Sequence, residues 1–140
     1  MYIKPNSTMK ITSVIARYLL GFIFLVFGLN GFLHFLPGQM PSGVAGQFIG
    51  ALFVSNYLAA IFLVQLIGAV LLLINRYVPL ALTLLAPVIV NILLFHALMA
   101  PAGLVLALVV TVLWGLVFLS VRSAFRGLWQ PRFPATGLPQ

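Results

Sequence analysis

Five side chains that can exchange hydrogen bonds or protons lie within otherwise apolar sequence. They are Asn30, His34, Gln65, Asn91 and His96. Amides both donate and accept hydrogen bonds, and imidazole can transfer protons near neutral pH. The sequence has no Asp, Glu or Cys, so acid–base chemistry within these segments would fall to the two histidines. No nucleophile–base pair or phosphate-binding loop accompanies them, and the sequence therefore contains no self-contained catalytic constellation.

The spacing of these residues argues against a metal site. Asn30 and His34 are one helical turn apart and share a helix face. Asn91 and His96 point about 140° apart on an ideal helix, unless Pro87 distorts it. Two histidines without a carboxylate or thiolate provide too few ligands for a typical protein-held metal or haem. We therefore predict no protein-held metal and expect the histidines to lie near the membrane surface, wetted by water and headgroups.

The composition requires a membrane. Of 140 residues, 64% are hydrophobic and only 5% are charged, whereas soluble domains carry about 25% charged residues on their surfaces. The chain is therefore predicted to be an integral membrane protein of the all-α class, with one compact domain. The first apolar run lacks a small-residue cleavage pattern, so we interpret it as a retained span and not a signal peptide. The absence of cysteine excludes disulfides and thiolate chemistry within the chain.

Charges, prolines and turn-prone residues divide the chain into pieces of about 20 residues, the length that crosses the hydrocarbon core. The apolar stretch before Ser55 contains several glycines and predicts a short interfacial helix between the first two spans. A basic, proline-rich tail follows the last span. We predict a four-helix transmembrane bundle with spans at 18–36, 57–74, 79–98 and 102–121, the interfacial helix at 44–54 and the tail at 122–140.

All seven cations fall on one side of this four-span arrangement. The positive-inside rule then places both chain ends in the cytoplasm. We expect anionic lipid headgroups near Arg122, Arg126 and Trp129, and no nucleic-acid binding, because the charges sit in an aromatic and aliphatic background. The cations are Lys4, Lys10 and Arg17 before the first span, Arg76 between the second and third, and Arg122, Arg126 and Arg132 after the fourth.

Each span carries a hydrogen-bonding side chain near the middle of the membrane. From the helical rise, the amides of Asn30 and Asn91 lie about 18 Å from the cytoplasmic edge and that of Gln65 about 15 Å, and the hydroxyl of Thr111 in the fourth span also lies at about 15 Å. Lipid cannot satisfy amides, so these three should point inward. They could form hydrogen bonds between helices and hold the bundle together, each contributing about 0.6 kcal/mol to its stability. Alternatively, they line a polar pocket that opens beneath His34 and His96.

Several segments resemble the DoxX family of small bacterial four-helix membrane proteins. The segments are "RYLLGFIFLVFGLNGFLHFLP", "LIGAVLLLINRYVPLALTLLAPVIVNILLFH" and "APAGLVLAL…SAFRGL". The resemblance implies a bacterial inner-membrane location, a quinone-linked redox context and, as matching site residues, Asn30, His34, Asn91 and His96. Similar proteins often carry a Glu where Gln65 stands. A role that requires only hydrogen bonds is therefore expected here.

Three functions follow from these observations. The leading hypothesis is a subunit of a membrane redox system that binds a small neutral or quinone-like molecule through Asn30, Gln65 and Asn91, with His34 and His96 gating the site or relaying protons. The chain would then be at most one part of a quinone-linked oxidoreductase, with a redox partner subunit. The second is a structural or assembly subunit without a ligand. The third is a carrier for a small solute or lipid, which would need to form a homo-oligomer because four spans are few for a transport path.

Overall fold

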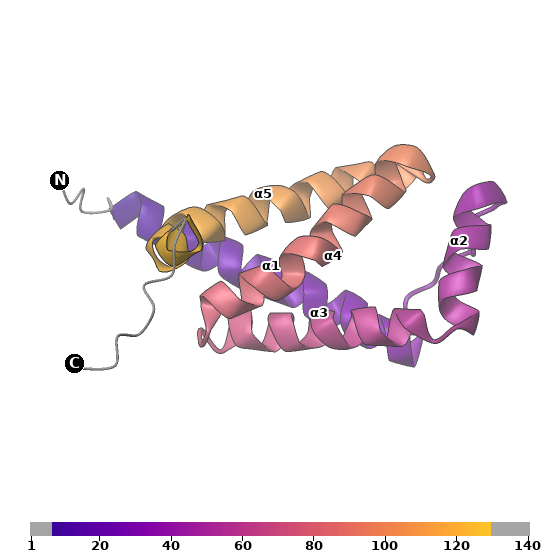
Figure 1. Cartoon of the computed structure of the whole chain (residues 1–140), viewed down its shortest axis with the longest axis horizontal. Coiled ribbons are helices and arrows are strands. Elements are labelled where there is room, and N and C mark those ends of the chain that lie inside the picture. Colours follow the sequence, from indigo (N-terminus) through magenta and orange to yellow (C-terminus); the bar gives the residue numbers. More distant parts are fainter. Residues whose placement is uncertain (1–6, 130–140) are drawn as a thin grey trace, which may run out of the picture.

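The computed structural model describes residues 7–129, and every regular element in this part is a helix (Figure 1). The all-α prediction is confirmed for these residues. Lys4, Arg132 and the remaining tail residues after Trp129 lie outside the described part. The elements are α1 (Ser7–Leu33), α2 (Gly43–Val54), α3 (Tyr57–Leu73), α4 (Val78–Leu98), the 3-10 turn η1 (Pro101–Gly103), α5 (Leu104–Val121) and the 3-10 helix η2 (Arg122–Trp129).

Helix α1 begins well before the expected start of the first span. The first span was predicted to start at Tyr18, and the helix that contains it starts at Ser7, because no proline or glycine interrupts the intervening residues. The helix ends at Leu33, where the next residue, His34, adopts a left-handed backbone conformation with φ of 51°. Asn30 fixes this turn, because its Oδ1 accepts a hydrogen bond of 2.7 Å from the backbone N–H of Leu36.

Helices α2 and α3 meet at an angle of 84°. The bend occurs at Asn56, which is left-handed with φ of 60°. Helix α3 has 17 residues and at the helical rise covers about 26 Å, slightly less than the hydrocarbon core. Three helical segments of the described part are long and apolar enough to cross a membrane, and a fourth is added if the bent pair counts as one span.

Each of the four long helices packs against two others. Helix α1 packs most extensively on α3 and also on α5, and α4 packs on the same two helices. Glycines allow α1 and α3 to approach closely. A methyl group added at Gly28 would lie 2.9 Å from the Leu66 side chain, and one added at Gly21 would lie 2.9 Å from Leu73.

The buried core lies toward the α3–α4 turn. Figure 1 shows α3 and α4 together at this turn and diverging toward the end that carries α2. No residue of α3 before Gln65 is buried, and none of α4 after Ile89. Gln65 therefore belongs to the last buried layer before the helices separate. The largest fully buried side chains are Leu20, Leu72, Leu82, Leu85 and Val117.

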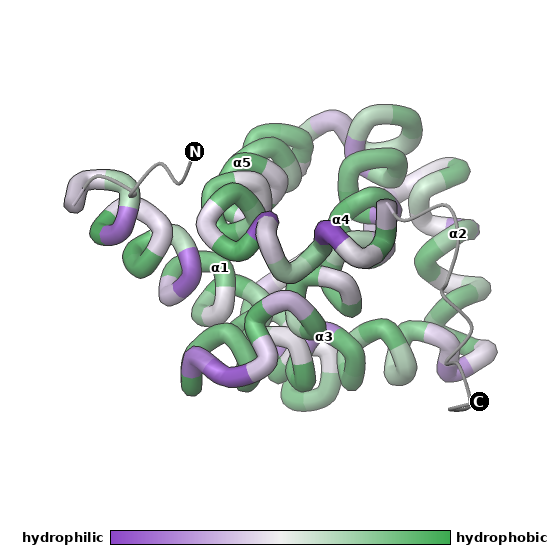
Figure 2. The backbone as a smooth tube through the Cα atoms, turned by 60° about the vertical axis from the view of Figure 1, so that its left-hand side comes forward, coloured by the Kyte–Doolittle hydropathy of each residue, from purple (hydrophilic) through white to green (hydrophobic). Residues whose placement is uncertain are grey.

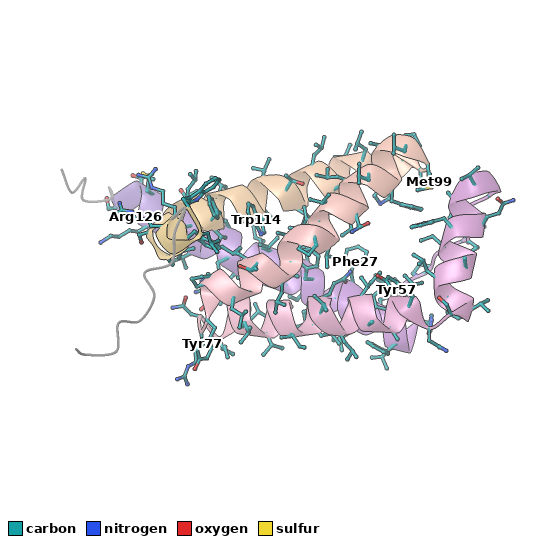
Figure 3. All side chains as sticks on the ribbon, viewed as in Figure 1. Phe27, Tyr57, Tyr77, Met99, Trp114 and Arg126 are labelled. Atoms are coloured by element: carbon teal, nitrogen blue, oxygen red, sulfur yellow. The ribbon has the colours of Figure 1, made fainter. Side chains whose placement is uncertain are left out.

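Hydrophilic residues gather at the helix ends. Figure 2 shows hydrophobic residues along the middle of the helices and hydrophilic ones mainly near the turns and the start of α1. In Figure 3, Arg126 and Tyr77 mark one end of the molecule, and Tyr57 and Met99 mark the other. The described cations Lys10, Arg17, Arg76, Arg122 and Arg126 all belong to the segments at the first end. We call this the basic end.

Candidate functional site

Gln65 is the one predicted site residue that the structure buries. Its exposed fraction is 6%, and it faces α1, where its Cβ would lie 3.5 Å from a methyl group added at Gly28. Its Oε1 has no hydrogen-bond partner, and among the described residues it is the only buried side-chain polar atom in this condition. Buried polar atoms in proteins nearly always have a partner. This unpaired oxygen therefore marks the strongest candidate position for a small hydrogen-bonding molecule.

Asn30 and His34 build the end of α1. Asn30 is half-buried, and its side-chain oxygen is already occupied by the N–H of Leu36. His34 is exposed, and its ring centroid lies 6.5 Å from that of Phe53 on α2 in an edge-to-face arrangement. These two residues thus connect α1 to the segment that leads into α2. The Nδ2 of Asn30 remains without a bond to the described residues.

Asn91 does not point into the bundle. It is exposed, and its Nδ2 donates a hydrogen bond of 2.8 Å to the carbonyl oxygen of Pro87, one turn earlier in α4. The expectation that all three amides face inward is therefore wrong for Asn91. The prediction failed because a carbonyl of its own helix accepts one N–H of the amide, which lowers the cost of an outward-facing side chain without removing it.

His96 closes the turn between α4 and α5. Its Nδ1 lies 2.8 Å from the carbonyl oxygen of Ala100, and a methyl group added at Gly103 would overlap its ring. Because a carbonyl only accepts, this contact requires a proton on Nδ1, and in the neutral ring Nε2 is then an acceptor. The ring also packs edge-to-face on Phe95, whose own ring stacks on Phe48 of α2.

The five residues occupy three environments: one buried amide, one exposed amide, and three side chains at helix ends. Within residues 7–129, no group of three His, Cys, Asp or Glu side chains is placed to hold a metal ion. The chemistry open to Gln65 is hydrogen bonding, as an acceptor through Oε1 or a donor through Nε2.

Sequence reasoning missed the buried arginine of α1. Arg17 was expected to precede the first span as an orientation signal, yet it lies inside α1 with an exposed fraction of 7%. Its Nη1 donates to the carbonyl oxygen of Leu72 near the end of α3, and its Cζ lies 4.4 Å from the ring centroid of Tyr18. A cation is favoured at a helix C-terminus. The sequence did offer a signal: the residues on both sides of Arg17 are compatible with a helix, which indicates that α1 continues through it.

Comparisons with protein-family models, with curated proteins and with solved structures find no match to this chain. The DoxX resemblance thus remains a prediction from the sequence motifs.

Proposed function

We propose that the protein is a DoxX-like, four-span protein of the bacterial inner membrane that binds a small neutral or quinone-like molecule as part of a membrane redox system. The observation that carries this proposal is the buried, unpaired Oε1 of Gln65. A donor from a bound molecule would remove the cost of that unpaired acceptor, about 1–3 kcal/mol.

The chemistry of an amide suits both redox forms of a quinone. The Oε1 of Gln65 would accept a hydrogen bond from the hydroxyl of a quinol. Rotation of the amide by half a turn would present Nε2, which can donate to the carbonyl of the oxidised form. Gln65 belongs to the last buried layer of α3, and no residue of α3 before it is buried, so a ligand would approach it along this less buried part of the helix.

The remaining candidate residues would act nearer the mouth of this site. Asn30 would donate through its unbonded Nδ2, and His96 would accept a hydrogen bond through Nε2 of the neutral ring, since its Nδ1 is bonded to the carbonyl of Ala100. His34 would lie at the outer edge, where it is exposed.

Replacing Gln65 with leucine should abolish retention of the bound molecule and leave the fold intact. Leucine fills a similar volume without an unpaired polar atom, so we expect equal or higher thermal stability. We expect the amount of co-purified quinone or similar molecule to fall about tenfold or more, as expected from the loss of one well-formed buried hydrogen bond. Mild extraction followed by native mass spectrometry and solvent extraction of lipids measures this amount.

Asn91→Leu is the matched control, because it also replaces an amide side chain with leucine, but at an exposed position of α4. Retention of the molecule in this variant, together with its loss in Gln65→Leu, supports the interior site. Equal retention in both variants contradicts it.

The exposed amide of Asn91 favours a second candidate function, that of an assembly subunit. An amide directed at lipid is costly, and a helix of another subunit could cover it. The spectra of the same two variants distinguish this function. Loss of a higher-mass complex in Asn91→Leu, with no small molecule bound in either the parent protein or the variants, would indicate an assembly role.

The proposed orientation can be tested by single-cysteine labelling, because the chain contains no cysteine to give a background. Ser55→Cys and Ser123→Cys are isosteric changes at exposed positions on opposite ends of the bundle. We expect a membrane-impermeant maleimide to label Ser55→Cys in intact spheroplasts, and Ser123→Cys only after permeabilisation. The reverse pattern would overturn the cytoplasmic placement of the basic end.

A further inference from the structure

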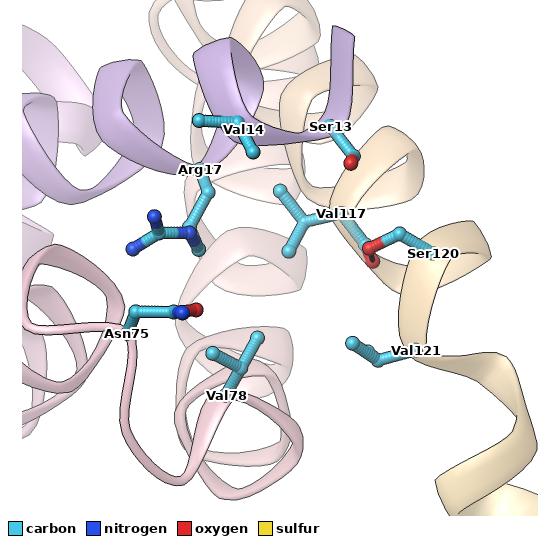
Figure 4. Close-up of a pocket in the computed structure, with 8 residues that line it drawn as sticks. All are labelled: Ser13, Val14, Arg17, Asn75, Val78, Val117, Ser120 and Val121. Carbon is cyan, nitrogen blue, oxygen red and sulfur yellow. Dashed lines mark hydrogen bonds between the residues drawn. The ribbon is translucent and has the colours of Figure 1, made fainter. Parts of the chain in front are cut away.

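A small pocket lies at the basic end, where α1, the α3–α4 connection and the end of α5 meet (Figure 4). Its volume is about 110 Å³, several times the room that one water molecule needs. Figure 4 shows the guanidinium of Arg17 and the amide of Asn75 on one side, with the hydroxyl groups of Ser13 and Ser120 on the other. The lining residues are Ser13, Val14, Arg17, Asn75, Val78, Val117, Ser120 and Val121.

Within residues 7–129, the positive charge of Arg17 has no carboxylate partner. The side chain is 7% exposed, and the whole sequence contains no Asp or Glu. A guanidinium carries five N–H donors, and within the described residues its one hydrogen bond goes to the carbonyl of Leu72. Contact with the ring of Tyr18 offsets only part of the cost of burying a charge. A bound anion would neutralise Arg17 and occupy its free donors.

The other polar groups of the pocket can also donate to an anion. The hydroxyl of Ser13 donates to the carbonyl of Lys10 at 2.9 Å, and that of Ser120 donates to the carbonyl of Val117 at 2.6 Å. Either hydroxyl can rotate toward a stronger, charged acceptor. The side chain of Asn75 makes no hydrogen bond within the described residues, so its Nδ2 is available.

We propose that this pocket binds a phosphate group. Arginine recognises phosphate through paired N–H donors, and basic pockets between transmembrane helices bind the phosphates of lipid headgroups. The basic end supplies further positive charge through Lys10, Arg76 and Arg122. The phosphate can belong to an anionic lipid or be free in solution, because both present the same oxygens to Arg17. This site is separate from the one proposed at Gln65 and does not depend on it.

The test uses the full chain in detergent micelles, with native mass spectrometry and thermal unfolding as readouts. Phosphatidylglycerol, diacylglycerol with the same acyl chains, and inorganic phosphate are added separately. We expect phosphatidylglycerol to be retained and to stabilise the protein, and diacylglycerol to do neither. Stabilisation by inorganic phosphate without retention of phosphatidylglycerol would support the same pocket with free phosphate as its ligand.

Two variants assign the effect to the pocket. Arg17→Gln removes the charge, and Ser120→Leu fills the pocket from the exposed end of α5 and leaves the Arg17–Leu72 contact in place. Each should lower the affinity for the phosphate ligand about tenfold or more. Arg76→Gln is the control, because it removes an exposed cation from the same end without lining the pocket.

Ser120→Leu keeps the test decisive if Arg17→Gln does not fold. The proposal is overturned if neither phosphate compound binds, or if diacylglycerol binds as well as phosphatidylglycerol. It is also overturned if every variant that folds binds phosphate as tightly as the parent protein.

Discussion

Replacing Trp114 with alanine should destabilise the protein by about 3 kcal/mol. The Nε1–H of Trp114 donates to the carbonyl oxygen of Leu82 at 3.0 Å and so joins α5 to α4. Its ring also stacks on Phe118, with ring centroids 5.2 Å apart and an interplanar angle of 9°. We expect a loss at the lower end of the range for tryptophan because lipid, unlike water, solvates any apolar surface that becomes exposed. Thermal or chemical unfolding in detergent measures the change.

Two further variants separate the contributions of Trp114. Trp114→Phe keeps an aromatic ring and removes the hydrogen bond, so it should cost about 1 kcal/mol. Trp129→Ala changes the same residue type where 84% of the side chain is exposed, and should alter stability little. Equal losses from Trp114→Ala and Trp129→Ala would show that the contact between α4 and α5 does not stabilise the bundle.

Replacing Gly68 with alanine should destabilise the protein by about 1–3 kcal/mol, although alanine is the better helix former. The added methyl group would lie 2.7 Å from the Cγ of Leu85, a fully buried residue of α4. The core around Leu85 is packed, so α3 and α4 would have to move apart. Unfolding in detergent should show the loss, and labelling of cysteines placed near the α3–α4 turn should increase as the turn loosens.

Gly115→Ala provides the control for this steric argument. Gly115 lies in the middle of α5, and a methyl group added there would meet no atom within 4 Å. The variant should be neutral or slightly stabilising. The steric explanation for Gly68 would be refuted if both substitutions changed the free energy of unfolding by the same amount.

The sequence was informative about where helices end. Pro79, placed at the first turn of α4, and the turn residues before Tyr57 each mark a helix boundary close to the expected one. These signals are local, because they depend on backbone geometry that proline and short polar residues impose. The start of α1 was not predicted from hydropathy, because a helix can continue past the apolar segment through Lys10 and Arg17.

The orientation of the polar side chains could be predicted only in part. Gln65 lies inside as expected, whereas Asn91 lies on the exposed face. Both amides sit in apolar helices, and their sequence contexts are too similar to separate them. Which face of a helix is covered depends on the rotation of that helix against its neighbours, and an apolar helix has only a weak preference in lipid.

The sequence by itself determined that the described part of the chain is helical, that its long helices are apolar enough to cross a membrane and that its described cations gather at one end, because these properties follow from the number and order of residue types. Only the tertiary structure decided that Arg17 lies buried beside the end of α3 and that Gln65 keeps an unpaired oxygen. These features arise between residues far apart in the chain. The free energy of burying such groups depends on which groups meet when the helices pack, and a local sequence pattern does not specify those contacts.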